Sequence, residues 1–285
     1  MAQGSSDINP RGPVRGRRCA GACQNVSRQR KLARVSEMAK SVLGVIPARM
    51  ESKRLPGKPL RIIAGHPMLA WVYHRARQAR AIERIIVATD SEEIRACCSR
   101  ERIPVRMTSR EHRSGTDRLI EVMRSEPAGV YVNIQGDEPL VTGAHLAELL
   151  GALAASPDSQ VATLKIAMSA GEASDPNITK VVTGARGRAL YFSRGKIPCD
   201  RDETGAARYY KHLGFYAYTA AALQQFSQLA PSPLEICEQL EQLRFLENGI
   251  PIVVAEARED TIGVDTEDDL RRAEQFLLRT HAQLH

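Results

Sequence analysis

Several patterns are missing from this 285-residue sequence, and each absence argues against a class of protein. No run of about eighteen apolar residues is present, so no segment has the length of a membrane-spanning helix. The six cysteines include no CxxC pair, which argues against a zinc site or a dithiol redox centre. A P-loop signature and a strand-bound GxGxxG are also missing. We therefore expect a soluble, cytoplasmic protein with free thiols and no membrane partner.

The net charge of +7 is confined to one end of the chain. Residues 1–40 contain nine Lys or Arg against two acidic residues, whereas the rest holds 31 of the 40 basic and 31 of the 33 acidic side chains. A nucleic-acid-binding domain needs its basic residues gathered on a folded face. The neutral remainder therefore predicts no nucleic-acid partner.

Residues 1–40 are rich in Gly, Ser, Gln and Arg and have almost no aliphatic periodicity, so we expect a disordered basic extension. Four interpretations stay open: a tail without a role, a start codon upstream of a true start near Met38, an organellar transit peptide, or an RNA-binding arm. The lack of aromatics between the charges favours the RNA-binding arm least. Such an arm would lose its RNA steeply as salt rises.

From residue 41 the chain alternates between short apolar runs and segments with helical spacing. We expect strands at 42–46, 84–89, near Val105 and at 130–135, and helices at 68–80, 91–100, 114–124 and 143–155. This alternation predicts an α/β fold with a doubly wound, mostly parallel sheet.

The rhythm changes after Ser156, where Gly and Pro turns separate strand-like stretches. We expect strands at 161–166, 178–182, 189–192 and 209–218, then a helix at 234–247, a strand at 252–255 and a last helix at 267–278 capped by Thr266. The organisation predicted is one domain over 41–285 with an antiparallel insertion at about 157–232.

A basic loop follows the first apolar run and contains Arg49, Arg54 and Lys58. Ligands of open parallel sheets bind beyond the carboxyl ends of the strands, so this loop faces the expected crevice. Its cations and prolines fit a stiff clamp for a polyphosphate. An ordinary solvated basic loop is the alternative.

Two aspartates lie at the ends of later strands: Asp137 in Gln135-Gly136-Asp137 and Asp265 just before the last helix. Mg²⁺ binds one or two protein carboxylates together with phosphate oxygens and water, so the pair could hold this ion if the fold brings them together. Each also has a plain alternative, because Asp137 suits a strand-ending turn and Asp265 suits a helix N-terminus.

The stretch 107–118 is rich in hydrogen-bonding side chains beside a helix start, which fits reading the edge of a pyrimidine. A capped helix is the alternative. His112 has no Ser or Cys partner in a nucleophilic arrangement, so covalent catalysis is not indicated.

The sequence resembles the CMP-Kdo synthetases, or 3-deoxy-manno-octulosonate cytidylyltransferases, from about Val42 to Arg272. The motifs occur in order: IPARMESKRLPGKPL from Ile46, VATD from Val87, SGTDR from Ser114, VNIQGDEPL from Val132, ALYFSR from Ala189, KHLGFYAY from Lys211, PLEICEQLEQLR from Pro233 and GVDTEDDL from Gly263.

The resemblance implies a nucleotidyltransferase-like fold and transfer of CMP from CTP to the acidic sugar Kdo for lipopolysaccharide-type glycans, with Mg²⁺ as cofactor and pyrophosphate as the second product. Carried over to matching positions, Asp137 and Asp265 would hold the metal and, with Arg49 and Lys58, form the catalytic set. The CTP-binding residues implied are Arg49, Arg54, Lys58, Ala88, Thr89, Arg110, Ser114 and Gln135. The sugar-binding residues implied are Gln135, Arg194, His212, Tyr216, Glu241 and Gln242.

The resemblance also implies a homodimer in which the antiparallel section binds sugar and forms the dimer contact. The alternative substrates are an amino variant of Kdo or a sialic acid. A catalytically silent nucleotide-binding regulator is a further alternative, which retention of both aspartates and the basic loop argues against.

Overall fold

The computed structural model describes Met1 and residues 41–282 and 284, apart from residues 53 and 113. The predicted disordered extension therefore lies outside the described residues, except for Met1. Within the described parts of the chain, every helix is too short or too polar to span a bilayer.

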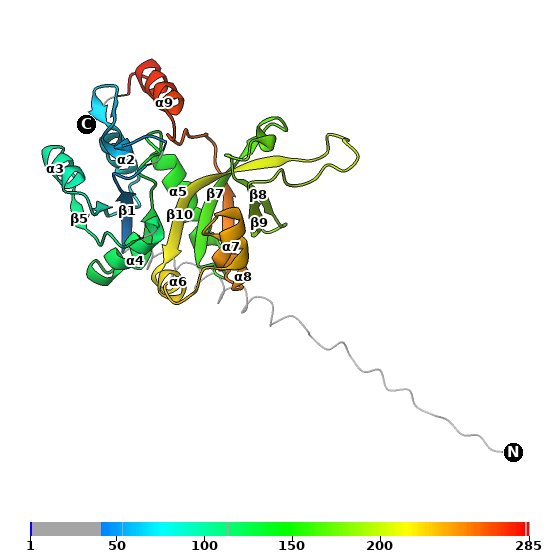
Figure 1. Cartoon of the computed structure of the whole chain (residues 1–285). Helices are drawn as coiled ribbons and strands as arrows, with labels where there is room; N and C mark the ends of the chain where they lie inside the picture. The colour runs from blue at the N-terminus through cyan, green and yellow to red at the C-terminus, as the bar shows by residue number, and fades with distance from the viewer. Residues whose placement is uncertain (2–40, 53, 113, 283, 285) are drawn as a thin grey trace.

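A nine-stranded sheet forms the centre of the protein, with seven strands in the order β11-β7-β10-β6-β1-β4-β5 and two more branching from β10 (Figure 1). In chain order the strands are β1 (Val42–Ala48), β4 (Arg84–Thr89), β5 (Val105–Met107), β6 (Val130–Asn133), β7 (Val161–Met168), β8 (Lys180–Thr183), β9 (Ala189–Ser193), β10 (Tyr209–Thr219) and β11 (Ile252–Glu256). A separate hairpin is made of β2 (Ile62–Ile63) and β3 (His66–Pro67).

Strand direction confirms the predicted mostly parallel sheet. The pairs β1–β4, β1–β6, β4–β5 and β7–β11 are parallel, and β10 runs against both β6 and β7. The predicted antiparallel insertion therefore shares the main sheet through β7 and β10. Figure 1 shows β8 and β9 extending to one side beyond these two strands.

Helices cover both faces of the sheet: α2 (Met68–Ala76), α3 (Glu92–Arg100), α4 (Gly115–Ser125), α5 (Gly143–Ala155), α6 (Ala220–Phe226), α7 (Pro233–Glu238), α8 (Leu243–Glu247) and α9 (Glu267–Arg279), with single turns η1 (Lys58–Leu60) and η2 (Glu172–Ser174). One apolar cluster joins Ile46 of β1 to Leu149 of α5, and another joins Val45 to Leu119 of α4. Neighbouring residues of β1 thus point to opposite faces, and burial of each such side chain contributes about 1.5–3 kcal/mol.

Local capping explains the helix starts. Ser91, Ser114, Thr142 and Thr266 each accept a hydrogen bond from a first-turn amide of α3, α4, α5 and α9. Side-chain oxygens at this position satisfy amides that have no partner inside the helix. The predicted start of the last helix at Thr266 is therefore correct.

The predicted helix over 234–247 is wrong as one element. It is two short helices, α7 and α8, separated at Gln239, whose φ of 53° is left-handed. The left-handed conformation is energetically unfavourable for a residue other than glycine, so contacts with surrounding residues must maintain it. Helix α6 and the β2–β3 hairpin were not predicted from the sequence.

Candidate active site

Three loops leave the same edge of the sheet, because β1 pairs in parallel with β4 on one side and β6 on the other. The basic loop follows β1, Asp90 follows β4, and Asp137 lies four residues beyond the end of β6. In parallel strands the carboxyl ends meet at one edge, and ligands bind there in open α/β sheets. The candidate site is therefore positioned by the topology.

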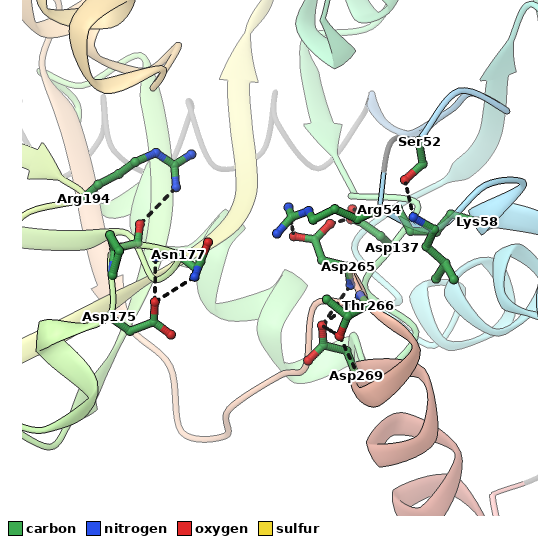
Figure 2. A network of polar contacts seen from close by, with 12 residues as sticks. Ser52, Arg54, Lys58, Asp137, Asp175, Asn177, Arg194, Asp265, Thr266 and Asp269 are labelled. Atoms are coloured by element: carbon green, nitrogen blue, oxygen red, sulfur yellow. Dashed lines mark hydrogen bonds and ion pairs between the residues drawn. The ribbon is translucent and has the colours of Figure 1, made fainter.

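The side chains of Asp137 and Asp265 meet around one lysine (Figure 2). Lys58 Nζ lies 2.7 Å from Asp137 Oδ2 and 2.8 Å from Asp265 Oδ1. Arg54 Nη2 lies 2.7 Å from the second oxygen of Asp265. Two aspartates far apart in the chain thus converge opposite the cationic loop, as the sequence analysis required.

A small apolar cluster holds the three loops of this site together. Leu55 comes from the basic loop, Leu140 from the segment after Asp137, and Val264 from the segment before Asp265. All three are buried, and the Val264 amide donates to the carbonyl of Asp137 at 2.8 Å. The carboxylates are therefore placed by packing beneath them and by a backbone hydrogen bond.

The ionisation of the cluster follows from its pairing. Burial acts to raise the pKa of Asp265, but the hydrogen bond and charge of Lys58, with Arg54, outweigh it and hold the pKa below its ordinary value. Burial acts to lower the pKa of Lys58, but Asp137 and Asp265 outweigh it and raise it. Opposite charges at hydrogen-bond distance favour the charged forms, so the lysine and Asp265 are ionised at neutral pH.

The donor set fits a divalent cation that arrives with a phosphate. Both carboxylates contact the same ammonium, which shows that the pair can hold positive charge between them. No group of three or more His, Cys, Asp and Glu among the described residues could hold a metal. A cation here would therefore take its remaining ligands from phosphate oxygens and water, as Mg²⁺ commonly does.

A cavity of about 350 Å³ lies beside the loops after β1 and β4 and is lined by Arg49, Arg110 and His112, among others. A smaller adjoining cavity of about 90 Å³ is lined by Arg49, Ser114 and Gln135. Four of the predicted CTP-binding residues are thus gathered around two neighbouring hollows. These hollows offer cations for phosphates and polar groups for a base.

Ala88 and Thr89 are fully buried at the end of β4. The Thr89 hydroxyl accepts a hydrogen bond from the amide of Ser91, which itself lines the larger cavity. Ala88 and Thr89 therefore precede, in the chain, the residues that line this cavity.

Arg118 is a site residue that the sequence analysis did not single out. It lines both cavities, is 3% exposed and pairs with Asp90 at 3.0 Å. It also donates to Thr108 Oγ1 at 2.7 Å and to the carbonyl of Ser109 at 3.1 Å. Its spacing to the core residue Val122 of α4 was a signal, because a buried arginine on a core face needs a polar role.

Predicted sugar-binding residues line a third cavity of about 130 Å³, namely Gln135, Tyr216, Glu241 and Gln242. Gln135 also lines the smaller nucleotide-side cavity, so the two hollows share a wall. Two buried polar atoms in this lining, Tyr216 Oη and Asn133 Oδ1, have no hydrogen-bond partner among the described residues. Such atoms are costly unless a ligand or water satisfies them, so the cavity suits a hydroxyl-rich molecule.

His212 stands next to this cavity, with its ring 5.4 Å from that of Tyr216. Its Nε2 lies 2.9 Å from Thr163 Oγ1. Burial lowers the pKa of His212 to about 3, so the ring is neutral at physiological pH and acts as a hydrogen-bonding group rather than a cation.

Arg194 lies apart from the aspartate pair, as Figure 2 shows. Its Nε donates to the Glu238 carbonyl at 3.0 Å and its Nη1 to the Pro176 carbonyl at 3.4 Å. Among the described residues, no hydrogen bond or ion pair joins it to the other predicted sugar ligands. The structure thus brings together most of the predicted site residues and leaves Arg194 at a distance.

Comparisons with known proteins identify the family of this chain. The sequence matches the cytidylyltransferase family over residues 43–257. It is 55% identical to a 3-deoxy-manno-octulosonate cytidylyltransferase of Acidobacterium capsulatum, covering 84% of this chain and 97% of the relative. A second such protein, from Koribacter versatilis, is 52% identical over 86% of this chain and 93% of the relative.

Solved structures give the same result. A CMP:2-keto-3-deoxy-manno-octonic acid synthetase complexed with CTP superposes with a TM-score of 0.81 at 43% identity, covering 84% of this chain and 99% of that chain. A putative glucose-1-phosphate thymidylyltransferase of Bacillus anthracis has a TM-score of 0.59 at 17% identity over 83% of this chain and 95% of that chain, which shows a shared fold alone. The chain therefore belongs to the cytidylyltransferase family and, within it, to the 3-deoxy-manno-octulosonate cytidylyltransferases.

Proposed function

We propose that this protein transfers CMP from CTP to 3-deoxy-manno-octulosonate, giving CMP-Kdo and pyrophosphate. An oxygen of the sugar's anomeric hydroxyl forms a bond to the α-phosphorus, the bond from that phosphorus to the bridging oxygen breaks, and pyrophosphate leaves. The hydroxyl proton passes to solvent. No covalent enzyme intermediate is needed.

The observation that carries the proposal is the meeting of Asp137, Asp265 and Lys58 at the carboxyl edge of the sheet, where Asp265 lines a cavity of about 550 Å³. Phosphoryl transfer depends mainly on holding the reactants in line and neutralising charge. A cationic loop facing two carboxylates supplies both kinds of contact. The same edge carries the hollows that could hold the base and the sugar.

Each group of side chains has a task in this proposal. Arg49, Arg54 and Lys58 bind the triphosphate, because guanidinium and ammonium groups form charge-assisted hydrogen bonds with phosphate oxygens. Arg110 and Ser114, with the backbone around Thr89, hold the cytosine. Lys58 then exchanges its carboxylate partners for phosphate oxygens when the nucleotide enters.

Mg²⁺, the proposed cofactor, would be held by Asp137 and Asp265 and would supply neutralisation of charge on the phosphates. The two carboxylates would hold the ion beside the phosphates of the nucleotide. The loop cations keep the phosphate chain extended beside them.

The sugar acid is proposed to bind where Gln135, Tyr216, Glu241 and Gln242 line the third cavity. Gln135 stands at the wall between the sugar and nucleotide hollows, so it can contact both substrates. The unpartnered Tyr216 hydroxyl offers a hydrogen bond to a sugar hydroxyl. Arg194 would receive the sugar carboxylate, since a guanidinium pairs well with this group.

We also propose that two copies associate through the antiparallel section. Exposed apolar side chains support it, since Leu190 of β9 in this section is 64% exposed and Ile236 of α7, just after it in the chain, is 66% exposed. Sedimentation equilibrium tests this part, and a monomer at assay concentration would refute it. The expected cytoplasmic location also remains part of the proposal.

The test is pyrophosphate release by the purified protein with CTP, Mg²⁺ and a panel of sugar acids that includes Kdo, its amino variant and a sialic acid. UTP and ATP serve as nucleotide controls. Turnover with CTP and Kdo is the expected result. Turnover with another sugar acid alone would make that sugar the substrate. Turnover with none of them would refute the proposal and favour a catalytically silent nucleotide-binding protein.

A further inference from the structure

We infer that Glu138 and Thr261 are positioning residues that hold Asp265 against Asp137. The inference rests on the proposed function, because it assigns a task to side chains that line one cavity with Asp265, a member of the proposed metal-binding pair. Neither residue is among the proposed ligands of the metal, the nucleotide or the sugar. Their role is to fix one carboxylate relative to the other.

A direct hydrogen bond links the two residues across the site. The Thr261 hydroxyl donates to Glu138 Oε2 at 2.7 Å. Thr261 is 1% exposed, so water does not compete for its hydroxyl. A hydrogen bond shielded from water in this way is stronger than one at the protein surface.

The backbone makes a second connection in parallel. The amide of Val264 donates to the carbonyl of Asp137 at 2.8 Å. Residues 137 and 138 are therefore tied to residues 261 and 264, one by main chain and one by side chain. Asp137 and Asp265 stand directly beside these two ties.

The segment that carries Asp265 needs such ties because it has no regular structure of its own. Residues 257–265 join β11 to α9 without forming a helix or a strand. Lys211 of β10 adds an anchor, since its Nζ lies 2.9 Å from Asp260 Oδ1 and 2.9 Å from the Thr261 carbonyl. A loop without helical or strand hydrogen bonding takes its shape largely from contacts of this kind.

Glu138 also packs closely against the same loop. A Cβ atom added to Gly263 would lie 3.2 Å from Glu138 Oε1, so the carboxylate rests almost against the backbone there. A third carboxylate beside Asp137 is unfavourable by like-charge repulsion. The position of Glu138 beside Asp137 is explained if its hydrogen bond to Thr261 and its contact with this loop fix the geometry of the site.

The matched pair Thr261→Val and Thr261→Ser tests the inference. Valine keeps the shape and removes the hydroxyl, whereas serine keeps the hydroxyl. The probe is Mn²⁺, with free ion counted by electron paramagnetic resonance in the presence of CTP and without sugar. For Thr261→Val we expect Mn²⁺ affinity to fall about tenfold, the cost of losing one buried hydrogen bond. Thr261→Ser is expected to bind Mn²⁺ like the original protein.

Steady-state kinetics and melting separate positioning from general stability. For Thr261→Val we expect kcat to fall at limiting Mg²⁺ and to recover partly at high Mg²⁺, with KM for the sugar unchanged. Thr280→Val, which removes a hydroxyl hydrogen-bonded to the Phe276 carbonyl at the far end of α9, is the matched control. Glu138→Gln, which keeps an acceptor oxygen, is expected to be milder than Glu138→Ala.

The outcomes distinguish this inference from the proposed function. If Asp265→Asn weakens Mn²⁺ binding but Thr261→Val does not, the positioning role is refuted and the metal site stands. If Asp265→Asn leaves Mn²⁺ binding unchanged, the proposed metal site fails and the inference fails with it. An equal loss in the serine and valine variants would also overturn the role of the hydroxyl.

Discussion

Replacing Asp265 by Asn tests the centre of the proposed site with little risk to the fold. The side chain is 46% exposed and its partner Arg54 is 56% exposed, so that ion pair contributes only about 0.2–1 kcal/mol. The contact with Lys58, whose side chain is 14% exposed, adds about 1 kcal/mol. A total near 1–2 kcal/mol lowers the melting temperature of a domain of this size by roughly 2–8 °C.

The expected effect on turnover is much larger than the effect on stability. Removing one group that stabilises charge in the transition state costs about 2.7–4 kcal/mol, or roughly 10²–10³-fold in kcat. The assay is continuous pyrophosphate release with CTP and Kdo at saturating Mg²⁺. Melting is followed by circular dichroism on the same samples.

Asp268→Asn is the matched control, because Asp268 lies in the first turn of the helix α9 that follows Asp265. Its side chain is 83% exposed and forms an ion pair with Arg271. We expect the control to keep its activity. A fully active Asp265→Asn protein would refute the assigned role. A loss of kcat that follows the loss of folded protein would refute it equally.

The remaining predictions concern Lys58, Tyr216 and His212. Lys58→Met should raise KM for CTP and lower the melting temperature at pH 7. Because the pKa of Asp265 is depressed in the folded state, the stability from this pairing is complete above the unfolded pKa of about 3.9 and is lost as pH falls. The melting temperatures of the original protein and of Lys58→Met should therefore converge at low pH. A difference that persists there would contradict the prediction. Tyr216→Phe removes a buried hydroxyl that has no partner among the described residues, so we expect unchanged or higher stability by about 1 kcal/mol in urea titration, with KM for Kdo raised about tenfold; an unchanged KM would remove Tyr216 from the sugar site. Since burial lowers the pKa of His212 from an unfolded value near 6.5 to about 3, stability should fall as pH drops below 6.5, by about 2 kcal/mol at pH 5, and His212→Asn should lose this dependence; a variant with the same acid sensitivity would refute the assignment.

Elements whose signal is local were predictable from the sequence. The strand over 84–89 and the helix over 143–155 have the predicted bounds, because one is a short run rich in β-branched residues and the other a periodic segment between capping and turn residues. The start of α9 was predictable for the same reason, because the Thr266 hydroxyl accepts a hydrogen bond from the amide of Asp269, three residues further along.

Elements that depend on distant contacts were not predictable. The predicted helix over 234–247 breaks at Gln239, where Leu240 turns into the core and Glu238 binds the backbone of Arg194. Helical spacing continues through this point, so nothing local in the sequence marks the interruption. The burial of Arg118 also depends on a distant contact, its ion pair with Asp90 of another loop.

The residues that give the site its chemistry could be predicted from the sequence, because the type of each residue and the strand that it follows are both local features. Strand order placed the loops after β1, β4 and β6 on one edge. Only the tertiary structure decided that Asp137 and Asp265 share one lysine, because that distance depends on packing between segments far apart in the chain. It also decided that Arg194 stands apart, since backbone carbonyls of two other segments hold its side chain.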